Sequence, residues 1–408
     1  MAGSAVGLGN IWRFPYIVGE HGGAAFIIIY IACCLLVSLP IFFAEGVIGK
    51  STRKDVFGSM EQIAPGGKLK YVGYFTILTS FVVLSFYCVV GGWSFDYLIR
   101  SLAGNFNGKS IAEAREVFAG VGASLFENVG SMLVFLALTC LIVGFGIEKG
   151  IGRFSKVSIP VLFVMMVAIA VVSVSLPGAR AGVDYLLKPD FSKIDGPAIA
   201  AALGQSFFSL SLGMGTILTY SSYMREEENI LATGGWTALF DTLFALIAGF
   251  AIMPAVFAAG IEPAAGPSLV FETLPIIFSR MGLVLPVVFF LSILIAALSS
   301  SISILEVIVS WLVDQKKMGR WKAVLLVFTF AVVLGTACAI VPKVFNTCDF
   351  LSSNVLMMAG ALAFALIAGW AMPREQVLHH VKSRFIYWLI RYAAPVMIVA
   401  IAVTSLLY

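Results

Sequence analysis

Residues 3–10 read GSAVGLGN, and residues 209–216 read SLSLGMGT. Each stretch places glycines and small polar side chains inside an otherwise apolar segment. A break in a membrane helix frees backbone N–H and C=O groups, which are tolerated only where they are buried in protein or line a cavity. Such breaks at corresponding places in two halves of a chain are the best sequence indication of a transport site. Either stretch alone is explained as well by close helix packing through its glycines, but the matched pair favours a site.

The composition around these stretches is that of a polytopic membrane protein. Of the 408 residues, 60% are hydrophobic and only 12% are charged, and the mean hydropathy is +1.00. Soluble domains contain about 25% charged residues. Apolar runs of about 20 residues predict roughly eleven membrane spans. We expect them near residues 2–18, 24–48, 70–100, 128–146, 155–176, 198–222, 233–259, 282–313, 321–341, 350–372 and 385–407.

The formal net charge of +4 is distributed by membrane side, so we expect no nucleic-acid partner. If the loop after the second span is cytoplasmic, 17 of the 26 Lys and Arg residues lie inside, and the positive-inside rule then places the C-terminus outside. We therefore expect a multi-pass protein of the cell membrane, most simply a bacterial inner membrane. The 17 inner residues are Lys50, Arg53, Lys54, Lys68, Lys70, Lys149, Arg153, Lys156, Arg225, Lys316, Lys317, Arg320, Lys322, Arg374, Lys382, Arg384 and Arg391.

Neither processing signals nor metal-ligand spacing stand out in the sequence. Met1 leads directly into the first span without a basic segment, so we expect no cleaved signal peptide. The six cysteines and three histidines are spaced as packing and loop residues, so we expect no site built from these ligands.

The polar groups at the two breaks favour an alkali cation as a ligand. Asn10 supplies an amide oxygen, and Ser209 and Ser211 supply hydroxyl oxygens at alternate positions. Hard oxygen ligands of this kind suit Na⁺ better than a transition metal. Half-helix ends add free carbonyls for a cation and N–H groups for an anion.

Three carboxylic acids fall inside the apolar runs, where charge is costly and usually functional. Asp241 follows the second break closely enough to complete a cation site with Asn10 and Ser209, and the alternative is a neutral buried acid. We expect Glu45 to bond the freed backbone of the first break. Glu306 has no role that the sequence assigns.

Residues 296–303, AALSSSIS, place several hydroxyls on one turn of an apolar helix. They could complete a second cation site with carbonyls of the first break. In isolation the favoured alternative is that each hydroxyl bonds back to a carbonyl of its own helix.

The outer segment 260–281 mixes prolines with apolar residues. It predicts either a lid over an outer cavity or an amphipathic loop lying on the membrane, and the sequence does not choose between the two.

Several motifs together resemble the neurotransmitter:sodium symporter family, and specifically its bacterial amino-acid transporters. The resemblance follows nearly the whole chain through GSAVGLGNIWRFPY (3–16), HGG (21–23), FFSLSLGMGTILTYSSY (207–223), LSSSI (298–302) and DF (349–350). It implies an all-α membrane fold of two five-helix inverted repeats with discontinuous helices 1 and 6, plus an extra helix. The whole chain would be one transporter domain, with repeats at about 1–176 and 197–372 and the extra helix at about 385–407.

The resemblance also implies two sodium sites and a substrate site between the breaks. The first sodium would be held by Ala5, Asn10, Ser209, Asp241 and the substrate carboxylate, and the second by Gly3, Val6, Ala296, Ser299 and Ser300. The substrate carboxylate would be bound by Leu8, Gly9 and Tyr87, and the ammonium by carbonyls of Ala5, Phe208 and Ser209. The side-chain pocket would be lined by Val83, Tyr87, Phe208, Ser211, Met214, Ser300 and Ile304.

This lining is mostly apolar and lacks a fixed charge, which favours a neutral hydrophobic or aromatic L-amino acid. The implied function is Na⁺-coupled import by alternating access, as a monomer or homodimer, and not enzymatic catalysis. Animal relatives usually carry Asn where this chain has Asp241 and hold a chloride ion nearby, whereas Ala245 here supplies no ligand. We therefore expect chloride independence.

The family pattern also implies gates. Arg13 and Asp349 match the outer salt-bridge pair, above Tyr87 and Phe208. Asp314 matches the acidic partner of an inner arginine that would precede Met1, so the inner half of the first helix is expected to be missing from this sequence. That departure keeps a second interpretation open, in which the chain is a passive leak pore or an inactive fragment.

Overall fold

The computed structural model describes residues 1–261 and 269–407. Over these ranges the chain is helical and contains no β-strand. Nine helices within the described part are long and apolar enough to span a membrane. They are α3–α4 (Ala24–Thr52), α6 (Lys70–Leu102), α8 (Leu125–Gly144), η3–α9 (Ile147–Val174), α13 (Ile230–Ala258), α15 (Val284–Lys316), α16 (Arg320–Ile340), α17–η7 (Pro342–Ala371) and α20–α21 (Arg384–Val403).

The two remaining predicted spans are the interrupted ones. The first consists of α1 (Ala2–Ala5), η1 (Gly9–Arg13) and α2 (Phe14–Glu20). The other consists of α11 (Gly196–Ser209) and α12 (Thr216–Ser222). Each piece is too short to span a bilayer by itself, which is why nine long helices stand where the sequence predicts about eleven spans.

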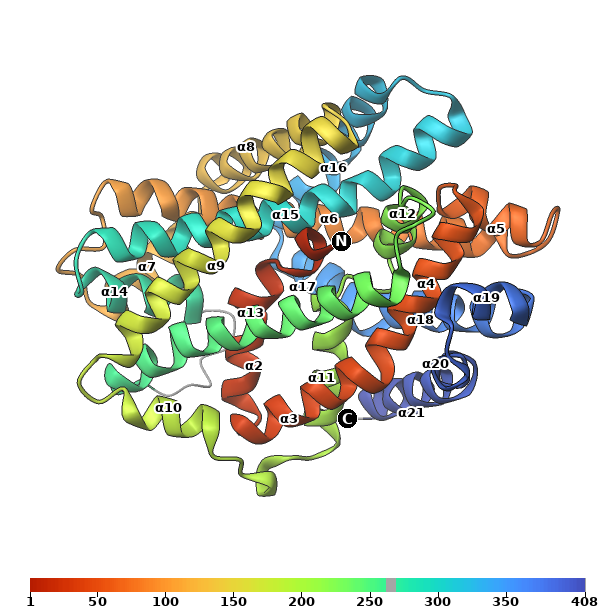
Figure 1. The fold of residues 1–408 in the computed structure, drawn as a ribbon. Helices are drawn as coiled ribbons and strands as arrows, with labels where there is room; N and C mark the ends of the chain where they lie inside the picture. The colour runs from red at the N-terminus through yellow and green to blue at the C-terminus, as the bar shows by residue number, and fades with distance from the viewer. Residues whose placement is uncertain (262–268, 408) are drawn as a thin grey trace.

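The broken helices lie inside the bundle. Figure 1 shows the N-terminus at the centre of the molecule, while α19 (Arg374–Val381) and α21 (Ala394–Leu407) lie to one side. α1 packs against α13 and α15, and α2 packs against α13. α6 and α15 pack along each other, and both are largely buried. Small residues allow the close approach of helices: a Cβ added at Gly92 of α6 would lie 2.6 Å from the Met132 backbone nitrogen of α8.

Short helices outside the spans begin at capping side chains. Asp55 accepts bonds from two amides of α5 (Val56–Ile63), and Ser110 forms a capping box on α7 (Ile111–Ala123). α10 (Arg180–Leu187) and the 3₁₀ turn η4 (Phe191–Lys193) precede α11.

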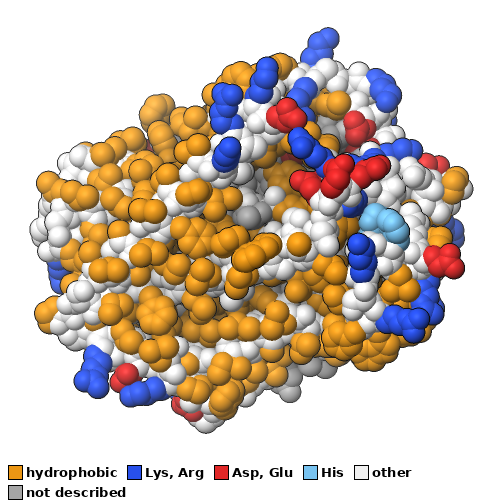
Figure 2. Space-filling model, in the orientation of Figure 1, with side chains coloured by type: hydrophobic (Ala, Val, Ile, Leu, Met, Phe, Trp, Pro, Cys, Tyr) orange, Lys and Arg blue, Asp and Glu red, His pale blue; other side chains and the backbone are white. Residues whose placement is uncertain are grey.

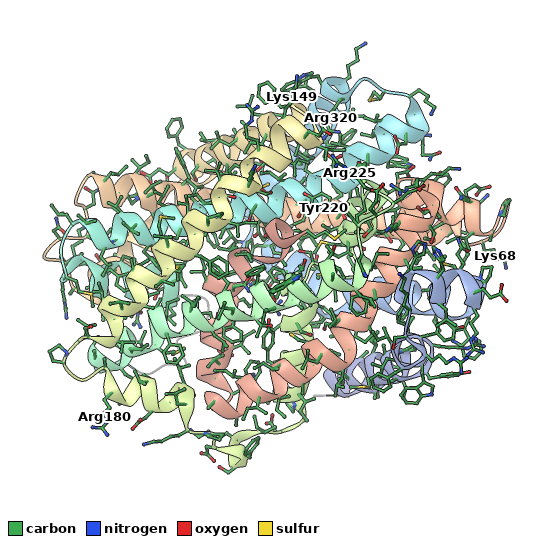
Figure 3. The ribbon with its side chains drawn as sticks, viewed as in Figure 1. Lys68, Lys149, Arg180, Tyr220, Arg225 and Arg320 are labelled. Atoms are coloured by element: carbon green, nitrogen blue, oxygen red, sulfur yellow. The ribbon has the colours of Figure 1, made fainter. Side chains whose placement is uncertain are left out.

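Charged side chains gather at two opposite edges of the molecule, with an apolar surface between them (Figure 2). In Figure 3, Lys68, Lys149, Arg225 and Arg320 lie toward the upper right, whereas Arg180 lies at the lower left. The first four are among the 17 basic residues that the sequence analysis assigns to the inner side. This separation agrees with a bilayer crossing the apolar band.

Residues 262–268 of the expected lid segment fall outside the described residues. The remainder forms η5 (Leu269–Thr273) and α14 (Leu274–Ser279), whose apolar side chains are buried. Phe271 packs on Trp93 and Tyr97 of α6 and on Phe118 of α7. The described part therefore packs into the protein rather than lying flat on the membrane.

Candidate functional site

The first break lies between Ala5 and Gly9, where the chain leaves the α-helical hydrogen-bond pattern. Its freed backbone groups are paired with side chains. Asn10 Oδ1 accepts a bond from the Gly7 N–H at 3.1 Å, and Gln205 Nε2 donates to the Gly9 carbonyl at 3.1 Å. Gln205 was not singled out by the sequence, although a buried amide one turn before the second break is a recognisable candidate for this role.

The second break runs from Leu210 to Gly215. Gly213 and Gly215 both have φ of +78°, in the left-handed region that favours glycine. Ser80 Oγ donates to the Met214 carbonyl at 2.7 Å, and the Gly213 N–H donates to Glu45 Oε1 at 2.7 Å. The expectation for Glu45 was therefore wrong in its target: it bonds the second break and not the first, because α4 (Leu39–Thr52) packs along α12.

The two breaks are joined through Ser4, which sequence reasoning missed. The Ser4 carbonyl accepts a bond from Ser211 Oγ at 3.1 Å, and the Ser4 hydroxyl donates to Ser303 Oγ of α15 at 2.8 Å. Ser4, Ser211 and Ser303 are buried, so one polar cluster ties together residues about 200 and 300 positions apart.

Asp241 lies beside this junction and is fully buried. Its Oδ1 accepts bonds from Asn10 Nδ2 and Ser209 Oγ, each at 2.7 Å, and its Oδ2 accepts one from the Tyr30 hydroxyl at 3.2 Å. Among the described residues, no Lys, Arg or His forms an ion pair with this carboxylate. The arrangement is thus a buried acid with three neutral donors and no cationic side chain. Tyr30 was not predicted, because its position in an apolar run gives no signal of a polar contact.

A second cluster of oxygens lies where α15 meets the first break. Ser299 Oγ is 3.0 Å from the Val6 carbonyl and 2.7 Å from the Ala296 carbonyl. The Ser300 hydroxyl faces the Ser4 carbonyl at 3.5 Å, and Gly3 packs against Ser155 of α9. The structure therefore brings three of the five expected oxygens into direct contact.

A small cavity lies between the breaks and is lined by Ala5, Gly7, Gly9, Val83, Tyr87, Phe208, Ser209, Ser211, Met214, Ser300 and Ile304. Its lining includes every expected substrate residue except Leu8, and it adds Gly7. The cavity volume is only about 10 Å³, enough for about one water. An amino acid fits only if the lining side chains move apart, which Met214, an unbranched side chain, does readily.

Tyr87 supplies a free polar group to this cavity. Its hydroxyl lies near the Leu8 amide and Ser300 but makes no hydrogen bond of ordinary geometry, although the residue is 2% exposed. A buried hydroxyl without a partner is costly, so its position suits a ligand oxygen.

On the outer side of the cavity, Arg13 lies over Phe208, with the guanidinium carbon 5.1 Å from the ring centre. Arg13 Nη1 donates to Ser353 Oγ at 3.1 Å, and Ser353 Oγ lies 3.4 Å from Asp349 Oδ1. The expected pair, Arg13 and Asp349, is thus linked through Ser353 and is not in direct contact.

On the inner side, Asp314 forms no ion pair within the described residues. Glu306, for which the sequence assigned no role, is fully buried and pairs with Arg320 while accepting a bond from the Tyr223 hydroxyl at 2.9 Å. This ion pair joins α15 to the start of α16. The basic residue just after the α15–α16 turn was a signal that sequence reasoning did not use.

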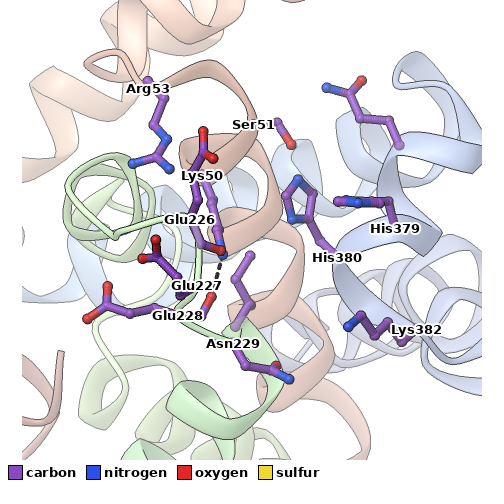
Figure 4. Close-up of a pocket in the computed structure, with 12 residues that line it drawn as sticks. Lys50, Ser51, Arg53, Glu226, Glu227, Glu228, Asn229, His379, His380 and Lys382 are labelled. Atoms are coloured by element: carbon purple, nitrogen blue, oxygen red, sulfur yellow. Dashed lines mark hydrogen bonds between the residues drawn. The ribbon is translucent and has the colours of Figure 1, made fainter.

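A larger cavity of about 500 Å³ lies at the inner end of α4 (Figure 4). Lys50 reaches across it to the backbone carbonyls of Glu226 and Glu228. Burial, and then the charges of His379, Lys50 and Arg53, lower the pKa of His380. No residue of either break lines this cavity. Although it is larger than the cavity between the breaks, it is therefore not the candidate substrate site.

The sequence matches the Sodium:neurotransmitter symporter family over residues 1–116 and 122–408. It is 36% identical to an uncharacterized sodium-dependent transporter of Haemophilus influenzae, over 100% of this chain and 95% of that protein. A sodium-dependent transporter of Bacillus subtilis is 34% identical over 98% and 94%. The fold is similar to the crystal structure of MhsT in complex with L-phenylalanine, with a TM-score of 0.93, 36% identity, and coverage of 99% and 96%.

Proposed function

The chain belongs to the sodium:neurotransmitter symporter family, and we propose that it imports a neutral hydrophobic or aromatic L-amino acid together with Na⁺. As a member it is a multi-pass sodium-dependent transporter of the membrane and not an enzyme. The substrate class, the number of ions and the independence from chloride belong to the proposal.

The observation that carries the proposal is the environment of Asp241. A buried carboxylate without a cationic partner is costly in a low-dielectric interior. Its neighbours Asn10 and Ser209 also carry oxygens that can ligate a cation: Asn10 Oδ1, which accepts the Gly7 N–H, and Ser209 Oγ, which donates to the carboxylate. A bound Na⁺ would supply the missing positive charge. Because the substrate carboxylate would also contact this ion, substrate and ion would stabilise each other.

A second Na⁺ would lie at the oxygen cluster of Val6, Ala296 and Ser299. Ser299 Oγ already lies 3.0 Å from the Val6 carbonyl oxygen and 2.7 Å from the Ala296 carbonyl oxygen. Gly3 and Ser300 would complete the shell after small movements, since both lie on the segments that form the cluster. Neutral oxygens of this kind match a monovalent cation.

The amino acid would bind in the central cavity. Val83, Phe208, Met214 and Ile304 give it apolar walls, and no Lys, Arg, Asp or Glu lines it. The unpartnered Tyr87 hydroxyl would donate to the substrate carboxylate, together with the amides of Leu8 and Gly9. The similar structure of MhsT is a complex with L-phenylalanine, which supports an aromatic amino acid as the substrate.

The near-closed cavity supports alternating access over an open pore. A volume of about 10 Å³ leaves no room for a chain of water molecules between the breaks. Substrate entry would require relative movement of the two halves, about 1–176 and 197–372, with Phe208 and the Arg13–Ser353–Asp349 linkage opening on the outer side.

Chloride would not be required, because Asp241 already supplies a fixed negative charge beside the first ion site and Ala245 offers no anion ligand.

Reconstituted protein tests these statements. Proteoliposomes given an inward Na⁺ gradient should accumulate labelled L-phenylalanine or L-leucine above the external concentration, equally in chloride and in gluconate. Choline in place of Na⁺ is the control and should abolish accumulation. Equilibration without accumulation would favour the leak pore, and uptake that depends on chloride would overturn chloride independence alone.

A further inference from the structure

A groove opens on the surface of the bundle at the inner end of α9, and no residue of either break lines it. Its volume is about 410 Å³. Its walls are Ile142 and Phe145 of α8 and its end, the α9 face within 153–161, and Ile295 of α15. Almost all of the lining is apolar except at the end formed by Lys149 and Arg153.

One face of α9 runs along the groove. Arg153, Val157 and Val161 follow at intervals of four residues, so they lie one above another over about 12 Å. Val157 is 62% exposed and Val161 40% exposed, and Phe145 opposite them is 59% exposed. The groove thus begins at basic side chains on the inner edge and continues into the apolar surface.

Over the described ranges, the two basic residues have no acidic partners. Neither Lys149 nor Arg153 takes part in an ion pair with any described residue, and both are exposed. Lys149 is labelled in Figure 3 at the upper edge, where Figure 2 shows several Lys and Arg side chains together. Glu148, the acidic neighbour in sequence, is also exposed but does not line the groove.

The α9 wall of the groove also contains a buried serine. Ser158 is 5% exposed, and its hydroxyl makes no hydrogen bond. Most buried serines in membrane helices bond back to their own helix, as Ser85 and Ser94 do here. Ser158 lines the groove about 7.5 Å along the helix from Arg153. Its unpaired oxygen is buried just beneath that lining, so the side chain must turn toward the groove to donate to a ligand.

We propose that this groove binds an anionic glycerophospholipid of the inner leaflet. Its phosphate lies on Lys149 and Arg153, a glycerol ester carbonyl accepts the bond from Ser158, and an acyl chain lies along Val157, Val161 and Phe145. Inner-leaflet anionic lipids are attracted to such basic clusters, and basic pockets between membrane helices bind their headgroups. The charge pair distinguishes this groove from the rest of the apolar surface, which any lipid covers.

The test is lipid retention by native mass spectrometry. Protein released from nanodiscs of equal phosphatidylglycerol and phosphatidylcholine with identical acyl chains should keep phosphatidylglycerol preferentially. In the double variant Lys149→Gln/Arg153→Gln, the preference for phosphatidylglycerol should fall at least about tenfold, because two positive charges that attract the phosphate are removed. Val157→Trp, which fills the groove while keeping the charges, should lower it as well, and Ser158→Ala should lower it partly.

The matched control is Lys316→Gln/Lys322→Gln, which removes two exposed inner cations that do not line the groove. It should retain the lipid like the unmodified chain, and thermal unfolding should show all variants folded. Equal loss in both double variants, unchanged retention in Val157→Trp, or equal retention of the two lipids would each overturn the proposal. Protection of Val157 by a second copy of the chain, detected as a dimer that excludes lipid, would overturn it too.

Discussion

At the scale of single residues, the site depends on polar groups whose partners come from distant parts of the chain. Asp241 on α13 receives bonds from Asn10 beside the first break, Ser209 beside the second, and Tyr30 on α3 (Ala24–Cys33). A carboxylate held by neutral donors alone retains an unbalanced charge. This imbalance gives the residue its expected role in binding a cation.

Asp241→Asn tests that role. The change keeps the shape and removes the charge, so the Na⁺ concentration for half-maximal uptake should rise at least about tenfold. Added chloride should restore part of the activity by replacing the lost charge. Asp184→Asn, at a partly exposed acid on α10 that pairs with Lys188, is the control for uptake measurements and should leave Na⁺ dependence unchanged. Normal Na⁺ dependence in Asp241→Asn would contradict a cation site here.

Tyr87→Phe removes the free hydroxyl of the central cavity. Because a hydrogen bond to a charged group contributes about 1.5–3 kcal/mol, the substrate dissociation constant should rise by one to two orders of magnitude. Scintillation proximity binding of the labelled amino acid measures it. Tyr97→Phe is closely matched, since Tyr97 is another buried tyrosine of α6 with an unpartnered hydroxyl but lies outside the cavity. Equal weakening in both variants would point to α6 packing instead of carboxylate binding.

At the scale of elements, the broken helices explain why the site forms where it does. The breaks free backbone groups, of which Asn10 bonds one from within the first break, and Gln205, Glu45 and Ser80 bond others from elsewhere in the bundle. The interruptions are therefore stabilised largely by neighbouring helices. The glycines of the second break are needed for conformation as well as for space. Gly213 has a positive φ and packs against the backbone of α18 (Met357–Leu366).

Gly213→Ala should therefore destabilise the protein. A Cβ is strained at this φ by about 1–3 kcal/mol and would also meet the Met357 carbonyl. The midpoint of thermal unfolding in detergent should fall. Gly235→Ala on α13 should stay within about 1 kcal/mol or stabilise, because it is helical and nothing lies within 4 Å of its Cβ position. A fall of equal size in both variants would count against a special requirement at Gly213.

The inner cavity beside α19 predicts a pH effect on stability. The pKa of His380 is lowered by burial and by nearby positive charges, so near pH 6.5 the folded state binds fewer protons than the unfolded chain. Stability is then full above pH 6.5 and is lost as pH falls through the folded-state pKa. Unfolding midpoints between pH 7.5 and 5.5 should fall less steeply in His380→Gln. Gln376→Ala changes the same cavity without removing a histidine and should keep the original slope; a slope unchanged in His380→Gln would refute the assignment.

At the scale of the whole molecule, the arrangement of charge sets the orientation in the bilayer. Basic residues of loops predicted to be inside lie at one edge of the structure, and Arg180 lies at the other (Figure 3). The apolar band between the edges matches the requirement that a bilayer places on a multi-pass protein.

Cysteine labelling in whole cells checks this orientation. Five native cysteines are buried, so Cys348→Ser gives a background with little reaction. In that background Lys188→Cys, at an exposed outer position, should react with a membrane-impermeant maleimide. Lys317→Cys should react only after permeabilisation. The reverse pattern would show that the chain is inserted the other way.

Much of the fold was predictable because membrane spans depend on local composition. The nine long helices begin and end within a few residues of the predicted limits, except for the start of η3–α9 and of α17–η7, and the two glycine-rich stretches predicted both breaks. The pairing of Asn10, Ser209 and Asp241 was also expected, because their residue types suit one ion. These features depend only on residue types and on the length of apolar runs, both of which are visible in the sequence.

The partners across the bundle were not predictable. Tyr30, Ser4 and Gln205 complete the junction, Glu45 bonds the other break, and Ser353 stands between Arg13 and Asp349. Each contact joins positions far apart in the chain, and its existence depends on how the helices pack. The sequence by itself thus determined the spans, the breaks and the chemistry offered at them. Only the tertiary structure decided which groups meet, because a hydrogen bond requires two atoms within about 3 Å of each other.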